Sequence, residues 1–342
     1  MRVHIQRVVA RLRSPFVSAT GTVSSAHLIL LRLETADGLV GTGEAVCLGI
    51  PSDEVMVALE DCREVLGDSD GEPLPEVLAA CADLAVLPQA VAAVDLALLD
   101  LAGRRARVPV WQVVGGESAP AVPVNATIAA PDRAGAAAAA ATARADGFSC
   151  VKVKVGLGDD AGRLAAVRAV AGADMAIRLD ANGAWSVPEA VASLRALAPV
   201  GLELCEEPAS GVDAIATVAE EVPDVAIALD ESAALPGALD SRACRAVCLK
   251  LSRSGGVLGL IDAARRARAA GYEVYLASML DGPLGIAGAL HAAAVIRPDR
   301  WCGLATLGLF DGRVDVLPAR AGALAVPSGP GLGDGLIDWY AA

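Results

Sequence analysis

The chain of 342 residues has few aromatic side chains, 3% of the total, and too few basic groups to balance its acidic ones, so its formal net charge is −13. Proteins that bind nucleic acid need a basic face, and those that bind single strands also need aromatic rings on which bases stack. The composition therefore excludes a nucleic-acid partner.

A long uninterrupted hydrophobic run is also missing. The uncharged and mostly apolar stretch over residues 282–296 contains Pro283 and His291 and is shorter than the roughly 20 apolar residues that cross a bilayer. The first residues alternate charged and apolar side chains and lack the apolar segment of a signal peptide. We therefore expect a cytoplasmic protein with no membrane partner.

The eight cysteines are scattered without a Cys-x-x-Cys pair, and the chain has only three histidines. Structural zinc sites need clustered cysteine and histidine ligands. We therefore expect the cysteines to be small buried residues in a reducing compartment. His291 lies in an alanine-rich stretch and is expected in the core.

Hydrophobic residues make up 54% of the chain, enough for one barrel and a smaller companion domain. Residues 2–13 and 27–46 alternate apolar and polar side chains, with Asp37-Gly38 at a turn, which predicts an antiparallel hairpin sheet. Helical spacing then extends over residues 53–66, 73–84 and 88–105. We expect an α+β capping domain over 1–115, against which the tail 307–342 packs.

Between residues 116 and 306, short apolar segments alternate with helical ones. The expected strands cover residues 122–127, 151–155, 176–180, 202–206, 225–229, 246–250, 273–278 and 302–306. This alternation predicts an α/β fold, a parallel (β/α)8 TIM barrel. A doubly wound sheet is the alternative, but no glycine-rich phosphate turn follows the first strand.

Five ionisable side chains end five successive expected strands, at intervals of 26, 26, 24 and 20 residues. They are Lys154, Asp180, Glu206, Asp230 and Lys250. Each interval is about one β/α unit, so the five groups are expected at one height around the barrel mouth. Active sites of such barrels are built at that face.

The residue types indicate the chemistry. Three converging carboxylates repel one another unless a cation joins them, and oxygen ligands favour Mg²⁺, with Mn²⁺ as an alternative. A lysine beside a divalent cation has a lowered pKa and can act as a base near neutral pH. This set suits removal of a weakly acidic proton next to a carboxylate.

The motifs around these groups form a recognisable series. They are Lys152-Val153-Lys154, Asp180-Ala181-Asn182-Gly183-Ala184-Trp185, Glu206-Glu207-Pro208, Asp230-Glu231-Ser232 and Lys250-x4-Gly255-Gly256. Together they resemble the enolase superfamily, muconate-lactonizing subgroup. Gly41-x-Gly43-Glu44-Ala45 and residues 93–103 are similar to its capping domain and linking helix.

The resemblance implies a role for each group. The implied Mg²⁺ ligands are Asp180, Glu206 and Asp230, and the implied acid–base pair is Lys154 and Lys250. Lys152 is implied as an electrostatic helper, and Asn182 and Glu231 as groups that orient the ligands.

Substrate contacts are expected from the capping domain and the last two strands. The expected residues are Phe16, Thr20, Ser278, Asp281 and Thr306. Residues 16–26 and 47–54 are expected to roof the site. The segment 14–26 is expected to be a loop. It contains no charged residue, so the distal end of the substrate is expected to be uncharged or apolar there.

The resemblance leaves several reactions open on a small carboxylate substrate. Residues 301–310 lack the Asp-x-Asp with which dipeptide epimerases hold an ammonium group, which favours muconate cycloisomerisation or dehydration to o-succinylbenzoate. Residues 303–306 and 124–127 resemble o-succinylbenzoate synthases, whereas residues 15–22 and 278–282 look more like cycloisomerases and epimerases.

The alternative is a dipeptide epimerase of the L-Ala-D/L-Glu type or an amino-acid racemase. No histidine lies between residues 28 and 290, so the His–Asp base of mandelate-racemase-like relatives is missing. A barrel without activity that serves as a binding module is a more distant alternative. We also expect a homo-oligomer.

Overall fold

The N-terminal part of the chain folds as an antiparallel sheet covered by helices. In a computed structural model, which describes residues 1–341, three strands pair in the order β1-β2-β3. They are β1 (Arg2–Ser18), β2 (Gly21–Glu34) and β3 (Val40–Val46). The turn between β2 and β3 is closed by a hydrogen bond from the Gly38 amide to the Thr35 carbonyl, as the Asp37-Gly38 pattern predicts.

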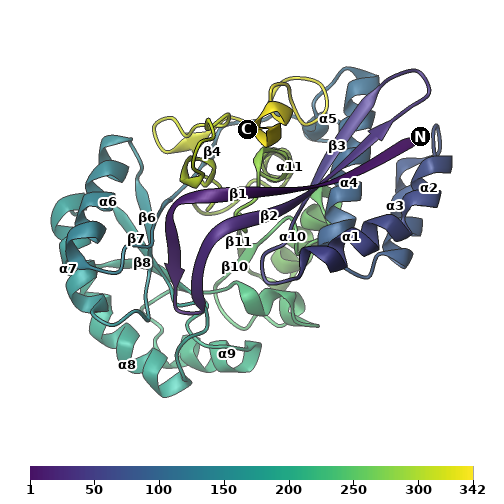
Figure 1. The fold of residues 1–342 in the computed structure, drawn as a ribbon. Helices are drawn as coiled ribbons and strands as arrows, with labels where there is room; N and C mark the ends of the chain where they lie inside the picture. Colours follow the sequence, from purple (N-terminus) through teal and green to yellow (C-terminus); the bar gives the residue numbers. More distant parts are fainter. Residues whose placement is uncertain (342) are drawn as a thin grey trace.

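The expectation of a loop over residues 14–26 is wrong. β1 and β2 continue as a hairpin whose turn is Ala19-Thr20, with Ser18 paired to Gly21 and Phe16 to Val23. The register shifts between Arg11 and Phe16, and β-branched residues such as Val17 favour the extended backbone. The hairpin bends from the capping sheet toward the barrel strands (Figure 1).

Helices cover one face of this sheet. They are α1 (Ser52–Asp61), α2 (Arg63–Asp68), α3 (Leu74–Leu84) and α4 (Pro88–Ala106), whereas the short α5 (Val110–Val113) packs on α4 and α11 (Pro283–Ile296). The helix expected over 53–66 is divided at Cys62. α4 packs so closely on β3 that a Cβ at Gly43 would lie 2.0 Å from the Ala93 carbonyl oxygen, which explains the glycines of the Gly41-x-Gly43-Glu44 motif.

The rest of the chain forms a parallel barrel, as predicted. Its seven-stranded sheet runs in sequence order from β5 to β11. The strands are β5 (Ala126–Ile128), β6 (Cys150–Lys154), β7 (Ala176–Asp180), β8 (Leu202–Glu206), β9 (Ile227–Leu229), β10 (Ala246–Leu249) and β11 (Glu273–Leu276), with β4 (Val122–Pro123) before them.

The expected strand over 302–306 forms only isolated bridges. Cys302 pairs with Val124, and Gly303 pairs with Ala277. Cys302 and Gly303 therefore take the place of the eighth barrel strand. They connect the end of β11 to the segment before β5. Close packing accounts for the glycine, since a Cβ at Gly303 would lie 3.1 Å from the Ala277 Cβ.

Helices surround the barrel (Figure 1). They are α6 (Arg133–Ala145), α7 (Asp160–Ala171), α8 (Val187–Leu197), α9 (Val212–Glu221), α10 (Val257–Ala270) and α11 (Pro283–Ile296). The fifth β/α unit, which begins with β9, lacks an α-helix. Two short 3₁₀ turns, η2 (Glu231–Ala234) and η3 (Ala238–Asp240), lie between β9 and β10 instead. The short interval from Asp230 to Lys250, with Pro236-Gly237 inside it, explains this difference.

The C-terminal tail packs on both parts of the chain. Its strand β12 (Ala323–Leu324) pairs with β4, and Phe310 bridges Leu12 of β1. Near its end, the Tyr340 hydroxyl donates a hydrogen bond to Glu44 of β3. Residue 342 of the expected tail lies outside the described residues, and the domain boundary at 115/116 stays a prediction.

The eight cysteines are all buried and free, and His291 is fully buried in α11. Within residues 1–341, no helix is long and apolar enough to cross a membrane.

Candidate active site

The barrel register places the ionisable strand-end groups side by side. Lys154 pairs in register with Asp180, and Asp180 with Glu206, across β6, β7 and β8. Asp230 and Lys250 directly follow β9 and β10. Four of the five side chains are buried and that of Lys250 is only 10% exposed, so charges of both signs share a site with little water.

Two lysines of β6 pair with the carboxylates of β7 and β8. The Lys152 ammonium lies 3.0 Å from both Asp180 Oδ2 and Glu206 Oε1. The Lys154 ammonium lies 2.6 Å from Asp180 Oδ2 and donates a second hydrogen bond of 2.9 Å to Asn182 Oδ1. Lys154 is thus held at one side of the barrel mouth.

Lys250 approaches from the opposite side. β7, β8 and β9 separate its strand β10 from β6. Its ammonium lies 2.6 Å from Asp230 Oδ2, and Arg253 Nη1 lies 3.3 Å from the other oxygen of the same carboxylate. Sequence reasoning missed Arg253, which stands three residues after Lys250.

Burial and charge shift the pKa values in opposite ways. Burial would raise the pKa of Asp180, but the charges of Lys152 and Lys154 outweigh it and lower that pKa. The pKa of Glu206 is raised, by burial first and then by Asp180 and Asp230 against Lys152. Burial would lower the pKa of Lys250, but the attraction of Asp230 raises it.

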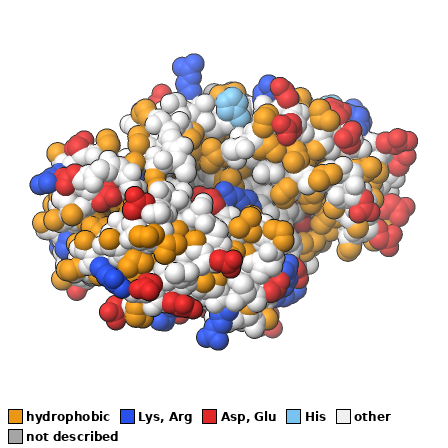
Figure 2. Space-filling model, turned by 90° about the horizontal axis from the view of Figure 1, so that it is seen from below, with side chains coloured by type: hydrophobic (Ala, Val, Ile, Leu, Met, Phe, Trp, Pro, Cys, Tyr) orange, Lys and Arg blue, Asp and Glu red, His pale blue; other side chains and the backbone are white. Residues whose placement is uncertain are grey.

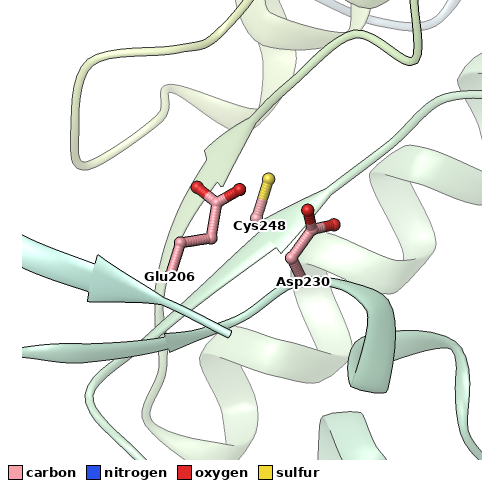
Figure 3. A group of neighbouring side chains, drawn as sticks. All are labelled: Glu206, Asp230 and Cys248. Carbon is pink, nitrogen blue, oxygen red and sulfur yellow. The ribbon is translucent and has the colours of Figure 1, made fainter. Parts of the chain in front are cut away.

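The carboxylates also form a group that suits a divalent cation. Ligand atoms of Glu206, Asp230 and Cys248 all lie within 4.8 Å of one another (Figure 3). Asp180 stands beside Glu206, with its Oδ2 shared by Lys152 and Lys154. Buried carboxylate oxygens on three adjacent strand ends fit a hard cation such as Mg²⁺, which would compete with the ammonium groups for the same oxygens.

The residues expected to orient the ligands lie next to them. Asn182, whose φ is 47°, accepts a hydrogen bond from Lys154 and donates one of 3.1 Å to Glu231 Oε1. The ligand roles of Asp180, Glu206 and Asp230 and the orienting roles of Asn182 and Glu231 stay predictions.

Glu207 is a supporting residue that the sequence reasoning missed. Its carboxylate accepts hydrogen bonds from the Asp230 amide at 2.7 Å and from the amide and hydroxyl of Ser232. Burial raises the pKa of Glu207 to about 7, against the lowering effect of these hydrogen bonds. It therefore holds the Asp230 turn in place, and its position after Glu206 is a signal that was available in the sequence.

Tyr275 of β11 is a second residue that was missed. Its hydroxyl donates a hydrogen bond of 2.7 Å to Glu206 Oε2, so both oxygens of Glu206 have protein partners. The Arg178 guanidinium lies 4.7 Å from the Tyr275 ring centroid. No local motif marks Tyr275, because it reaches Glu206 across the barrel interior.

The tip of the hairpin reaches the barrel mouth. The Lys154 ammonium lies 5.5 Å from the centroid of the Phe16 ring. A Cβ at Gly156 would lie 3.3 Å from the Ala19 Cβ. Thr20 is exposed at the turn, with its hydroxyl 3.0 Å from that of Ser18. Leu48, from the second expected roof segment, packs against the main hydrophobic core.

The other expected substrate residues form one hydrogen-bonded chain. The Thr306 hydroxyl lies 3.1 Å from the Ser278 hydroxyl. The Ser278 hydroxyl donates a hydrogen bond of 2.9 Å to Asp281 Oδ2. The same Asp281 oxygen accepts from the Met279 amide at 2.7 Å. The Glu44 carboxylate accepts from the next amide, Gly282, at 2.8 Å. One oxygen of the buried Asp281 carboxylate, Oδ2, is therefore already engaged by its own loop.

The missing fifth helix leaves a cavity of about 370 Å³ beside the site, with Asp230, Lys250 and Arg253 in its wall. On the face shown in Figure 2, acidic and basic side chains lie together in a hollow between the two parts of the molecule.

A TIM barrel with a capping domain, and with lysines and carboxylates at its strand ends, defines a class of acid–base enzymes. The family model "Mandelate racemase / muconate lactonizing enzyme, N-terminal domain" matches residues 1–115, and "Enolase C-terminal domain-like" matches residues 134–337. The chain belongs to this family of the enolase superfamily, as the sequence resemblance predicts. It is an enzyme of the isomerase or lyase type.

Curated relatives divide between activities. The D-Ala-D/L-Ala epimerase of Cytophaga hutchinsonii is 27% identical to this chain. The similarity extends over 98% of this chain and 95% of the epimerase. The L-Ala-D/L-Glu epimerase of Bacillus subtilis is 31% identical (86% and 84%), and muconate cycloisomerase 1 of Acinetobacter baylyi is 29% identical (81% and 80%).

Solved structures show the same division. The Cytophaga hutchinsonii dipeptide epimerase, complexed with Mg and D-Ala-L-Val, has a TM-score of 0.88 at 26% identity, covering 98% of this chain and 97% of its own. The muconate lactonizing enzyme of Pseudomonas fluorescens, complexed with muconolactone, has a TM-score of 0.87 at 25% identity (97% and 95%). Relatives thus act on small carboxylates, and magnesium is typical of them.

Proposed function

We propose that this protein uses a divalent cation, Mg²⁺ or Mn²⁺, to remove a proton from the carbon next to a carboxylate of a small substrate, through an enolate. The observation that carries the proposal is the placement of Lys154 and Lys250 on opposite sides of the barrel mouth, each 2.6 Å from a carboxylate of one row. A substrate carbon above that row lies between the two ammonium groups.

Each residue then has a physical task. Asp180, Glu206 and Asp230 would hold the cation, which supplies positive charge to the substrate carboxylate when bound. Lys154, held by Asn182, takes the proton in a dehydration, and in lactone formation from a muconate it delivers a proton to the enolate. Lys250 faces the opposite side of the substrate and stabilises the developing negative charge. Lys152, between Asp180 and Glu206, adds a positive charge below them.

Cycloisomerisation or dehydration is the reaction that the geometry favours. An α-amino substrate needs an acceptor for its ammonium group, and residues 301–310 carry no carboxylate. The Asp281 carboxylate is engaged by Ser278 and Met279. Muconate-like or succinylbenzoate-precursor substrates carry no ammonium group and need no such acceptor.

Epimerisation is the second candidate, and the pair of lysines is the observation that favours it. One lysine can remove a proton while the other returns it on the far side. Relatives named dipeptide epimerases, one of them solved with Mg and a dipeptide, add support.

The test is solvent exchange with a panel of carboxylates. Muconates, succinylbenzoate precursors, N-acyl amino acids and dipeptides are incubated with the protein and Mg²⁺ in deuterated buffer. We expect Mg²⁺-dependent deuterium incorporation or turnover for one class without an ammonium group. Exchange of a dipeptide alone would establish the second candidate, and no exchange anywhere would support a binding module. A homo-oligomer in the cytoplasm stays a prediction, which light scattering and cell fractionation test.

A further inference from the structure

Cys248 lies in the candidate metal site, where neither the motifs nor the proposed chemistry uses a sulfur atom. It precedes Lys250 by two residues on β10. Its Sγ lies within 4.8 Å of carboxylate oxygens of both Glu206 and Asp230. The thiol and the two carboxylates point toward one another at the open end of the strands (Figure 3).

The thiol is also without a partner. Cys248 is 1% exposed, and its thiol makes no hydrogen bond within residues 1–341. Burial first, and then the charges of Glu206 and Asp230, raise the pKa of the thiol well above its usual value against the lowering effect of Lys250 and Lys152, so a bound cation has to displace the proton. By contrast, Cys205 on β8 is bonded through its Sγ to the Glu206 carbonyl at 3.8 Å. Cys248 is therefore a buried, unsatisfied donor atom aimed at two carboxylates.

Ligand chemistry separates two groups of metals at such a site. Three oxygen ligands suit Mg²⁺, whereas a thiolate with carboxylates suits Zn²⁺, Co²⁺ or Cd²⁺. Tetrahedral ligands at about 2.0–2.3 Å from zinc lie about 3.5 Å apart. The Glu206, Asp230 and Cys248 atoms, within 4.8 Å of one another, therefore need only a small inward movement.

We propose that Glu206, Asp230 and Cys248 form a second coordination mode of this cavity, which binds a thiophilic divalent cation in competition with Mg²⁺. On binding, the Cys248 thiol transfers its proton to solvent and its sulfur becomes a metal ligand. For a cation to reach these oxygens, the Lys250 ammonium would have to leave Asp230 Oδ2, and Lys152 or Tyr275 would have to release one oxygen of Glu206. Zinc bound to Glu206, Asp230 and Cys248 therefore keeps Mg²⁺ out of the cavity and inhibits the enzyme. This inference rests on the proposed function and concerns its metal selectivity.

Co²⁺ is the probe, because thiolate-to-cobalt charge transfer absorbs in the near ultraviolet, whereas carboxylate ligands do not give that band. The full-length protein is titrated with Co²⁺ and, separately, with Mg²⁺ in a calorimeter. We expect the wild type to show the band at one equivalent and to lose it when excess Mg²⁺ is added. Cys248→Ser should lack the band and bind Co²⁺ at least about tenfold more weakly, with Mg²⁺ affinity within about threefold of wild type.

The matched control is Cys205→Ser, which replaces a buried cysteine of the neighbouring strand outside the group and should keep the band. Cys248→Ala, compared by thermal melting, separates lost coordination from lost folding. Persistence of the band in folded Cys248→Ser or Cys248→Ala, or Co²⁺ binding to wild type without a band, would overturn the inference. Failure of the magnesium assignment is a different result, seen as unchanged Mg²⁺ affinity in Asp180→Asn.

Discussion

Lys154 and Lys250 differ in their surroundings although both end barrel strands. Lys154 is bonded to Asp180 and Asn182 and lies beside the Phe16 ring, whereas Lys250 shares Asp230 with Arg253. A second cation at Asp230 makes Lys250 better placed to stabilise charge than to move a proton. We therefore expect the two lysines to have unequal tasks.

This inequality predicts the stereochemistry of exchange. Lys154→Ala should lower α-proton exchange by roughly 10²–10⁴-fold, and exchange in wild type should occur on a single face of a chiral substrate. Lys250→Ala should slow turnover without changing which face exchanges, since its role is electrostatic. NMR of both epimers in deuterated buffer measures this. Loss of opposite epimers in the two variants would instead establish the epimerase.

Asp180 is the residue on which the magnesium assignment depends most, because it stands beside Glu206 outside the closest ligand group. Asp180→Asn removes one of three carboxylate charges and should weaken Mg²⁺ binding more than about tenfold. Isothermal titration calorimetry measures the affinity, with Asp240→Asn, an exposed carboxylate paired with Arg266, as the control. Equal affinities for Asp180→Asn and wild type would remove Asp180 from the site.

Among the elements, the hairpin of β1 and β2 is the one that joins the capping sheet to the barrel mouth. Its tip brings Phe16 to Lys154 and Ala19 toward Gly156. Because this part of the hairpin carries no charge, it lowers the polarity around Lys154 and excludes water there.

Removing the Phe16 ring therefore should affect substrate handling rather than folding. We expect Phe16→Ala to raise KM and to lower kcat/KM about tenfold for the substrate that the panel identifies, since truncating a contact ring costs about 1–2 kcal/mol. Val9→Ala, at an exposed position of the same strand, is the control. Thr20→Ala tests the turn itself, and unchanged kinetics in both Phe16→Ala and Thr20→Ala would show that the hairpin does not roof the site.

At the scale of the whole molecule, His291 connects three parts of the chain. Its Nδ1 accepts the Trp111 amide of α5 at 3.3 Å, so Nε2 carries the proton and donates to the Leu332 carbonyl of the tail at 3.2 Å. Protonation of Nδ1 would place its hydrogen against the hydrogen of the Trp111 amide. Burial lowers the pKa of His291 to about 4, although the hydrogen bond to Leu332 opposes it.

The direction of the pH effect follows. A histidine with pKa lowered from 6.5 to about 4 contributes stability that is present above pH 6.5 and is lost as the pH falls toward 4, because the unfolded chain takes up the proton first. Between pH 8 and pH 5 the loss should be roughly 2 kcal/mol. Urea unfolding of wild type and His291→Gln at both pH values measures it, with a smaller loss expected in the variant.

Other buried groups change stability in the opposite direction. Burial raises the pKa of Glu44 to about 8 and that of Asp95 to about 7, so their contributions are lost as the pH rises. The difference between wild type and His291→Gln isolates the histidine from these groups. Equal losses in both proteins would contradict the predicted role of His291.

Much of the molecule followed from local pattern. The alternation of apolar strands and helices specified a barrel, because each strand and each helix has to bury its apolar side against the neighbouring elements. The regular spacing of Lys154, Asp180, Glu206, Asp230 and Lys250 predicted which face carries the candidate site, since parallel strands end at the same edge. Gly41 and Gly43 belonged to the motif that resembles the capping domain, but only the structure shows that they allow the close approach of α4 to β3.

Tertiary structure decided the contacts that cross from one element to another. Tyr275 and Cys248 reach the carboxylates of other strands, and the distances depend on strand stagger and barrel curvature, which no local pattern encodes. The segment 14–26 became a hairpin because β1 and β2 support each other along their whole length. Sequence alone therefore determined the five strand-end groups of the candidate site. Packing determined how they pair and which further side chains, such as Tyr275 and Cys248, lie beside them.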